Sequence, residues 1–369
     1  MAVYTTIDDP SAHFGTVIWS GNDADPRTIE FNGNSDLQPD LVITKARNDT
    51  NSWHTVDTNR GTTNASAVAL DRSEAEGSLT NGNTQLYGYI NAMTSDGFTV
   101  VDGSNTTSYN YNKSGTNFAG FGWKGNGGST TAVSASGSGD SQILASTHQA
   151  NTTAGFSIVR FTGIEANATV THGLGAVPEM IWFKNTISTN NWIVYHVGAG
   201  NDDGLYMNLD SGEVDNVAFF NDTTPTSTLF SVGTNDKTND SGSNSMIAYC
   251  FRSIQGYSKC GSYTGNGNAD GTFVYTGFQP AWVMHKRIDS TGNWFVFNNK
   301  VLGYNSENHR LLGDTYGTEA DPSDYDLLSN GFKIRFTSGN VNADTGEYVY
   351  AAFAESPFVT SKGIPTTAR

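Results

Sequence analysis

Three lysines and three tryptophans recur at fixed spacing and are the first candidates for chemistry. Each lysine follows a proline by six residues and precedes a tryptophan by eight: Pro39, Lys45 and Trp53; Pro178, Lys184 and Trp192; Pro280, Lys286 and Trp294. A lysine with a perturbed pKa can do chemistry, and an exposed tryptophan can stack on a sugar. A residue that occupies the same place three times is better explained by architecture. We expect lysine stems packed on a sheet with the ammonium groups at its edge or paired, and tryptophans that anchor a core.

A turn near the end of the chain resembles the first half of a calcium loop. NGNADG at 266–271 places Asn266, Asn268 and Asp270 at alternate positions before a glycine. The bidentate acid expected at position twelve of such a loop is missing, because Gly277 stands there. We interpret the segment as a hairpin turn and keep a calcium site as the alternative. The seven histidines show no metal-ligand spacing, so we predict no cofactor apart from this calcium alternative.

No catalytic motif is recognisable in the chain. A nucleophile elbow, a Walker loop and a metalloprotease helix are all missing. The acidic residues stand mostly in turns, outside any motif that would set two carboxylates across a glycosidic bond. Cys250 and Cys260 are expected to be free thiols, because a chain without a secretory signal is made in a reducing compartment. We predict no catalytic residue and no enzyme, with a hidden polysaccharide-degrading site as the alternative.

The residues above belong to a tandem repeat. The prolines open strand-like runs, PDLVITK, PEMIWFK and PAWVMHK, and each copy ends in an aromatic strand, NFAGFGW, SMIAYCF or YVYAAF. These last strands end at Trp123, Phe251 and Phe353. A leucine also follows each tryptophan by seventeen residues, at Leu70, Leu209 and Leu311. A pattern that returns three times predicts three copies of one structural unit.

Each copy offers seven short strands separated by Gly, Asn, Asp and Ser clusters, and no long segment has helical periodicity. The proline-led strand is apolar on both faces, as expected for a central strand covered on both sides. We therefore predict an all-β protein of three tandem antiparallel β-sandwich modules of jelly-roll or immunoglobulin type. The expected modules cover residues 12–124, 155–255 and 256–355. Residues 1–11 and 356–369 are expected as extended docking arms, and residues 125–154 as a flexible Gly/Ser/Thr-rich linker.

Composition excludes several classes of function. The chain has 20 Lys+Arg against 36 Asp+Glu and a formal net charge of −16. An acidic chain without a basic cluster is repelled by phosphate, so nucleic acid is not an expected partner. The chain has no apolar run of the roughly 20 residues that a membrane helix needs, so membrane insertion is not expected. The first residues lack the basic and apolar regions of a secretory signal.

Several segments resemble a family of repeat proteins from marine bacteriophages. They are TIDDPSAHF, GNSDLQPDLVITK, GLGAVPEMIWFKN, GYSKCGSYTGNGNADGTFVYTGF and LLSNGFKIRF with YAAFAESPF. The resemblance covers about residues 5–369, with the largest departures in the first repeat. Members of that family are commonly taken for tail-fibre or other virion structural proteins. The resemblance carries over no ligand-binding residue.

The resemblance implies a virion structural protein, assembled in the bacterial host cytoplasm. A tail-fibre or receptor-binding component that touches a host-surface glycan or protein is the first hypothesis. A capsid decoration or vertex protein is the alternative, and a polysaccharide-degrading tailspike enzyme is the second alternative. The expected partners are other virion proteins and, as oligomeric state, a homotrimer. The open alternative is a monomer whose three repeats supply pseudo-threefold symmetry.

Overall fold

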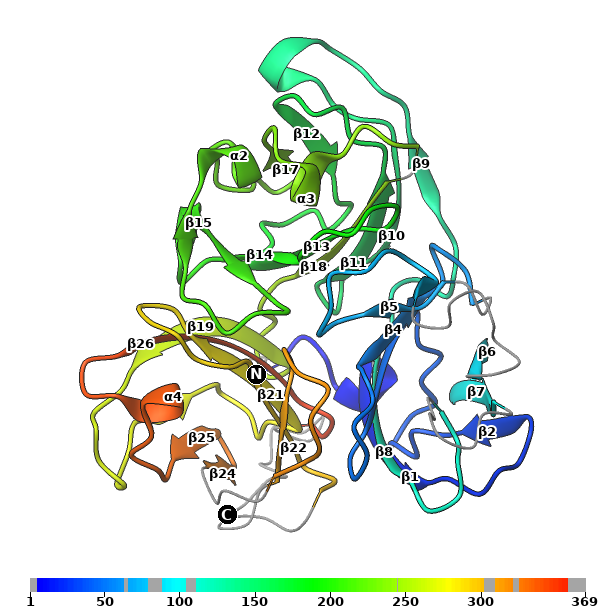
Figure 1. Ribbon diagram of the computed structural model, residues 1–369, viewed down its shortest axis with the longest axis vertical. Helices are drawn as coiled ribbons and strands as arrows, with labels where there is room; N and C mark the ends of the chain where they lie inside the picture. Colours follow the sequence, from blue (N-terminus) through cyan, green and yellow to red (C-terminus); the bar gives the residue numbers. More distant parts are fainter. Residues whose placement is uncertain are drawn as a thin grey trace.

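The chain forms an all-β body of three lobes arranged around a common centre (Figure 1). The computed structural model describes residues 5–62, 66–78, 88–103, 111–243, 245–301, 309–320 and 325–357. Each lobe corresponds to one sequence repeat and contains a large antiparallel sheet with a smaller sheet packed on its outer side. Antiparallel pairing of short strands confirms the predicted sandwich-type fold.

The large sheets of repeats 1 and 3 have the same strand order. In repeat 1 the order is β1 (Phe14–Ser20), β8 (Asn117–Trp123), β3 (Leu41–Ala46), β4 (His54–Asp57) and β5 (Val68–Ala69). In repeat 3 it is β19 (Ser258–Thr264), β26 (Glu347–Phe353), β21 (Trp282–Arg287), β22 (Phe295–Asn298) and β23 (Arg310–Leu312). The small sheets are β2 (Arg27–Ile29), β7 (Gly97–Val101) and β6 (Tyr89–Thr94), and β20 (Phe273–Tyr275), β25 (Gly331–Ile334) and β24 (Tyr325–Leu328).

Repeat 2 has the same central strands and a wider sheet. Its order is β16 (Val214–Asp215), β15 (Gly200–Tyr206), β14 (Ile193–His196), β13 (Met180–Asn185), β18 (Met246–Phe251), β11 (Phe156–Phe161), β10 (Ser146–Asn151) and β9 (Thr131–Val133). The small sheet pairs β12 (Ala168–Thr171) with β17 (Leu229–Val232). Short helices are η1 (Pro10–Ala12), η3 (Gly139–Ser141), α2 (Val217–Phe220), α3 (Asp236–Asn239) and α4 (Gly339–Asn342). No helix in the described ranges is long and apolar enough to cross a membrane.

Each large sheet separates two hydrophobic cores because its side chains alternate between the two faces. On β18, Ile247, Tyr249 and Phe251 face a core shared by all three repeats. Their neighbours Ala248 and Cys250 face a core that belongs to repeat 2 alone. Strands β8 and β26 alternate in the same way. The three large sheets therefore bury their inner faces against one another, and each small sheet covers an outer face.

The last aromatic residue of each repeat lies at the centre of the shared core. The ring centroid of Trp123 is 6.2 Å from that of Phe251 and 5.6 Å from that of Phe353, and the two phenylalanines are 5.9 Å apart. Three equivalent rings in mutual contact mark a pseudo-threefold axis. The repeats form one closed unit rather than a string of separate domains.

The structure departs from the sequence prediction at the expected linker and at the N-terminal arm. Within residues 125–154, β9 and β10 extend the sheet of repeat 2, with β10 paired along the edge of β11. Polar composition hid these strands, because an added edge strand needs backbone pairing more than apolar side chains. In the arm, Thr5 and Ile7 are buried, and Ile7 belongs to the shared core. Residues 5–11 are therefore packed against the body, while residues 358–369 lie outside the described residues.

The recurring leucines are not equivalent positions. The residues whose backbone N–H donates to the carbonyl of the repeated tryptophan are Leu70, Met207 and Gly313. Leu70 and Leu311 are buried, but Leu209 is 38% exposed on a loop. The spacing of seventeen is a coincidence, because the turns between these strands differ in length.

Candidate functional site

The conserved features of the repeats meet at three interfaces, which we call 1–2, 2–3 and 3–1 after the repeats they join. The indole N–H of Trp192 donates to the carbonyl of Ala69 at 2.7 Å across the 1–2 interface. Trp294 donates to Tyr206 at 2.8 Å across 2–3, and Trp53 to Leu312 at 2.8 Å across 3–1. All three indoles are buried. The tryptophans are core anchors as expected, and each also fastens its repeat to a neighbour.

The repeated lysines lie beside these tryptophans and are almost fully buried. Lys184 donates to the carbonyls of Ser73 and Asn190 at 3.0 and 2.8 Å, and Lys45 to that of Ala46 at 2.7 Å. Burial lowers the pKa of Lys184 to about 7 and the pKa values of Lys45 and Lys286 to about 8. Their ammonium groups satisfy backbone carbonyls at the interfaces, which is an architectural role.

A repeated glutamate was not recognised in the sequence. The backbone N–H of Glu76 donates to the carbonyl of Thr186 at 2.9 Å, that of Glu213 to Ile288 at 2.8 Å, and that of Glu319 to Arg47 at 2.6 Å. These three bonds are equivalent, one at each interface. The sequence signal that could have identified these glutamates is an acid or amide five residues before each of them: Asp71, Asn208 and Asp314. Each accepts a bond from the backbone N–H of the repeated tryptophan.

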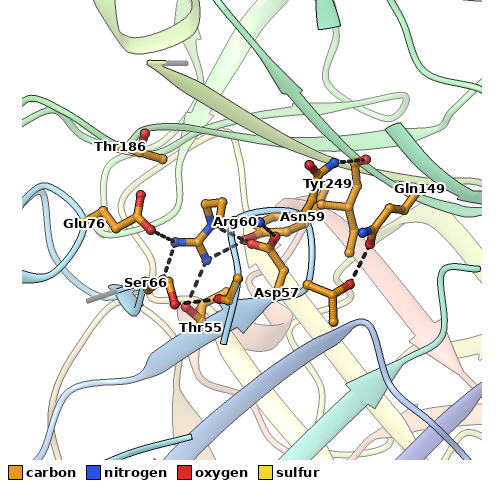
Figure 2. Close-up of polar contacts among 12 residues, drawn as sticks. Thr55, Asp57, Asn59, Arg60, Ser66, Glu76, Gln149, Thr186 and Tyr249 are labelled. Atoms are coloured by element: carbon orange, nitrogen blue, oxygen red, sulfur yellow. Dashed lines mark hydrogen bonds and ion pairs between the residues drawn. The ribbon is translucent and has the colours of Figure 1, made fainter. Parts of the chain in front are cut away.

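The 1–2 interface contains a buried charged cluster centred on Arg60 (Figure 2). Its guanidinium group donates to Asp57 at 2.5 Å and to the carbonyl of Thr55 at 3.2 Å, and it lies 3.4 Å from Glu76. Tyr249 of repeat 2 donates its hydroxyl to the same carboxylate of Asp57 at 2.7 Å. The side chains of Arg60 and Asp57 are fully buried.

The electrostatics of this cluster favour a permanently charged pair. The carboxylate of Asp57 raises the pKa of Arg60 against the opposing effect of burial. Burial raises the pKa of Tyr249, so its hydroxyl stays protonated and donates. Buried charges need partners on every side, and here the sites around the guanidinium group are taken by protein atoms. The cluster therefore joins two repeats through contacts between protein groups.

The strand β10 strengthens the same interface. Thr58 donates to the side chain of Gln149 at 2.6 Å, and Gln149 donates to the carbonyl of Gly128 at 3.1 Å. Asn59 donates to the carbonyls of Thr147 and Ile158, each at 3.3 Å. Residues 125–154, which were expected as a linker, therefore contribute hydrogen bonds between repeat 1 and repeat 2.

The 2–3 interface replaces the charged cluster with a neutral one. Strand register makes His196 the equivalent of Asp57, and Ala199 the equivalent of Arg60. Nδ1 of His196 accepts the N–H of Gly198 at 3.0 Å, and Nε2 lies 3.1 Å from the carbonyl oxygen of Tyr350. Nε2 therefore carries the proton and donates it. Burial lowers the pKa of His196 to about 4.

Beside this histidine the interface opens into a groove of about 330 Å³. It is lined by Gly198 of repeat 2 and by Ser262, Tyr263, Thr264, Ile288, Glu347 and Tyr348 of repeat 3. The 3–1 interface has a groove of about 340 Å³ that includes Asn32, Gly33, Asn34, Lys300 and Glu355. There Glu355 pairs with Lys300 at 3.0 Å and accepts from Asn299 at 3.1 Å.

The candidate calcium turn is a hydrogen-bonded hairpin between β19 and β20. The side chains of Asn266 and Asn268 accept the N–H groups of Asn268 and Asp270, each at 3.0 Å. Asn342 donates to the Asn266 side chain at 3.0 Å. Asp270 is 2.5 Å from the ammonium group of Lys333, which lowers the pKa of the carboxyl. The hairpin interpretation accounts for these contacts without an ion.

Cysteines and histidines form no site of their own in the described ranges. Cys250 and Cys260 are buried free thiols, and burial raises both pKa values. Burial lowers the pKa of His54 and of His285 to about 3. No group of three or more His, Cys, Asp or Glu that could hold a metal occurs among the residues described.

A family model matches residues 9–357, and this range contains all three repeats and their interfaces. The chain belongs to the DUF7483 family. The model is described as a domain of unknown function. No curated protein and no solved structure matches the chain.

The DUF7483 match runs without a break through the three lobes as one domain. This agrees with the shared core, in which the described residues of all three lobes together cover the inner faces of the large sheets. The DUF7483 domain offers two kinds of surface for function: the grooves at the 2–3 and 3–1 interfaces, and the outer loops of each lobe.

Proposed function

We propose that this chain is a virion structural protein of a bacteriophage, acting as a tail-fibre or receptor-binding component that contacts the host surface. The observation that supports this is the contact of Trp123, Phe251 and Phe353 on the pseudo-threefold axis. A chain closed on itself in this way is a rigid body that presents three similar lobes. Rigid scaffolds with variable loops are suited to recognition rather than to catalysis.

The pseudo-threefold symmetry of the chain bears on its expected oligomeric state. Fibres are commonly trimeric, and one chain with three repeats matches a threefold partner while presenting lobes that differ in sequence. The inner faces of the three large sheets are buried against one another within one chain. The proposed functional unit is therefore one chain, which is the monomer alternative to the homotrimer expected from the sequence. Sedimentation at a mass near 39.5 kDa would support it.

A second candidate is a capsid decoration or vertex protein. The described residues form a compact body without a shaft-like segment (Figure 1), and such a body also fits a threefold position on a shell. Antibody labelling or cryo-EM of the particle that carries this chain separates the two. Label at the tail supports the first proposal, label on the head supports the second, and absence from purified particles overturns both.

The tailspike-enzyme alternative has a separate test. Purified protein would be incubated with host surface glycan and assayed for new reducing ends. We expect none, because no catalytic motif is recognisable in the chain and the charged cluster around Arg60 is buried among protein groups. Release that disappears on substitution of a groove carboxylate would replace the binding proposal with an enzymatic one.

A further inference from the structure

The three equivalent glutamates at the interfaces have different counter-ions. Glu319 is paired with Arg47 through two bonds of 3.1 and 2.8 Å and lies 3.0 Å from His309. Glu76 lies 3.4 Å from the guanidinium group of Arg60. Glu213, at the 2–3 interface, has no cationic partner among the described residues. Two of three equivalent carboxylates thus hold an arginine, and the third holds none.

The surroundings of Glu213 are acidic instead. Burial raises its pKa, and the negative charges of four carboxylates raise it further: Asp203, Glu347, Asp289 and Asp202. The pKa of Asp203 is raised as well, by burial and by Asp202 and Asp215. Like charges held close together destabilise one another unless a cation intervenes. Asp289 alone of these carboxylates has a described ion pair, with Arg287 at 2.7 Å.

The groove of about 330 Å³ adjoins this acidic group. Ile288 and Glu347 line it, and the backbone of Glu213 is bonded to Ile288. The space exists because two cationic side chains of the 1–2 interface have small equivalents here. Strand register places Ser262 where repeat 2 has Arg160, whose charge acts on Glu76, and Ala199 where repeat 1 has Arg60.

We propose that this groove binds the guanidinium group of an arginine carried by another protein. The arginine would lie between Glu213 and Glu347 and would complete the charge pattern that the chain itself completes at the other two interfaces. Arginine fits better than lysine because its planar fork can bond two carboxylates at once. The proposal is independent of whether the chain is part of a virus particle.

The first test measures binding of a short peptide, acetyl-Ser-Arg-Ser-amide, by calorimetry or by chemical-shift titration. The matched probe carries citrulline, which has nearly the same shape without the charge. We expect the arginine peptide to bind at least about tenfold more tightly, as expected for a hydrogen bond to a charged group. Glu213→Gln and Glu347→Gln should each weaken its binding about tenfold, and Glu30→Gln, on the exposed surface of repeat 1, should not.

Because the chain carries a net charge of −16, a cationic peptide could bind it without a site. Equal weakening by Glu30→Gln and Glu213→Gln, or equal binding of the citrulline peptide, would overturn the proposal. A second variant, Ser262→Arg, supplies the cation from within by copying Arg160 of repeat 2. It should abolish arginine-peptide binding and raise the melting temperature, whereas Ser262→Gln should do neither. A folded Ser262→Arg protein that still binds the peptide would also overturn the proposal.

Discussion

The 1–2 and 2–3 interfaces use one backbone framework with opposite side-chain chemistry. Both have the indole bond to a neighbouring carbonyl, the buried lysine, and the glutamate N–H bond to the next repeat. The first adds Arg60 and Asp57, while the second has Ala199 and His196 in their places, beside an acidic groove. The framework therefore accounts for closure of the chain. The Arg60 cluster adds to this closure at the 1–2 interface, whereas the 2–3 interface has an open groove in its place.

Removal of the Arg60 charge should produce the largest change in unfolding free energy among the variants that distinguish the two interfaces. Arg60→Met leaves the buried carboxyl group of Asp57 without its cationic partner, so we expect the unfolding free energy to fall by about 3–5 kcal/mol. Urea denaturation measures this loss, and the slope of the unfolding free energy against urea concentration should be unchanged. The matched variant is Arg47→Met at the 3–1 interface, whose side chain is 16% exposed and should matter less. A loss below about 1 kcal/mol for Arg60→Met would mean that the cluster does not hold repeats 1 and 2 together.

The neutral cluster should respond to acid. The pKa of His196 is lowered to about 4, below the unfolded value of 6.5, so the unfolded chain binds more protons between these values. The contribution of the neutral His196 imidazole to the unfolding free energy is complete above pH 6.5. It is lost as the pH falls toward 4, at about 1.4 kcal/mol per pH unit. His196→Asn, which copies Asn298 of repeat 3, should flatten this part of the stability curve. Parallel curves for variant and parent would contradict the burial of a neutral imidazole.

The bonds that the two interfaces share should make equal contributions to the unfolding free energy. Trp192→Phe and Trp294→Phe each remove an indole donor and leave a buried carbonyl, and each also leaves a small cavity. We expect a loss of about 1–3 kcal/mol for each variant, with the two values close to one another. Thermal and urea unfolding provide the measurement. A loss confined to one variant would show that the repeats are not fastened by the same device.

The smallest expected effect is a gain in stability. The pKa of Glu213 is raised in the folded state, so its ionisation opposes folding as the pH rises through that value. Glu213→Gln should therefore stabilise the protein at pH 7 by a few tenths of a kcal/mol, since solvent screens a partly exposed group. At a pH below the unfolded value the two proteins should be equally stable. Glu319→Gln should lower the stability at pH 7, because it removes the carboxylate that accepts two hydrogen bonds from Arg47.

The repeat unit and its strands can be predicted from the amino-acid sequence alone. The recurring prolines and terminal aromatics located β3, β13 and β21 and the ends of β8, β18 and β26. Apolar residues on both faces of the proline-led strand predicted that both faces are covered. The burial of the repeated tryptophans followed from their register with these strands. The ammonium groups of the repeated lysines were expected at an edge or paired, and they are instead buried against backbone carbonyls. Local pattern is sufficient for these features because alternation fixes which side chains share a face.

The residues that cover the inner faces of the large sheets become known only from contacts made in the folded chain. An apolar sheet face can be buried by a second chain or by another repeat of the same chain. The pattern of alternating side chains along the strand is the same in both cases. The meeting of Trp123, Phe251 and Phe353, the pairing of Arg60 with Asp57 and Tyr249, and the acidic groove beside Glu213 all depend on contacts between distant segments. The strands β9 and β10 were likewise hidden, because their backbone groups find partners only once the sheet edge of repeat 2 has formed.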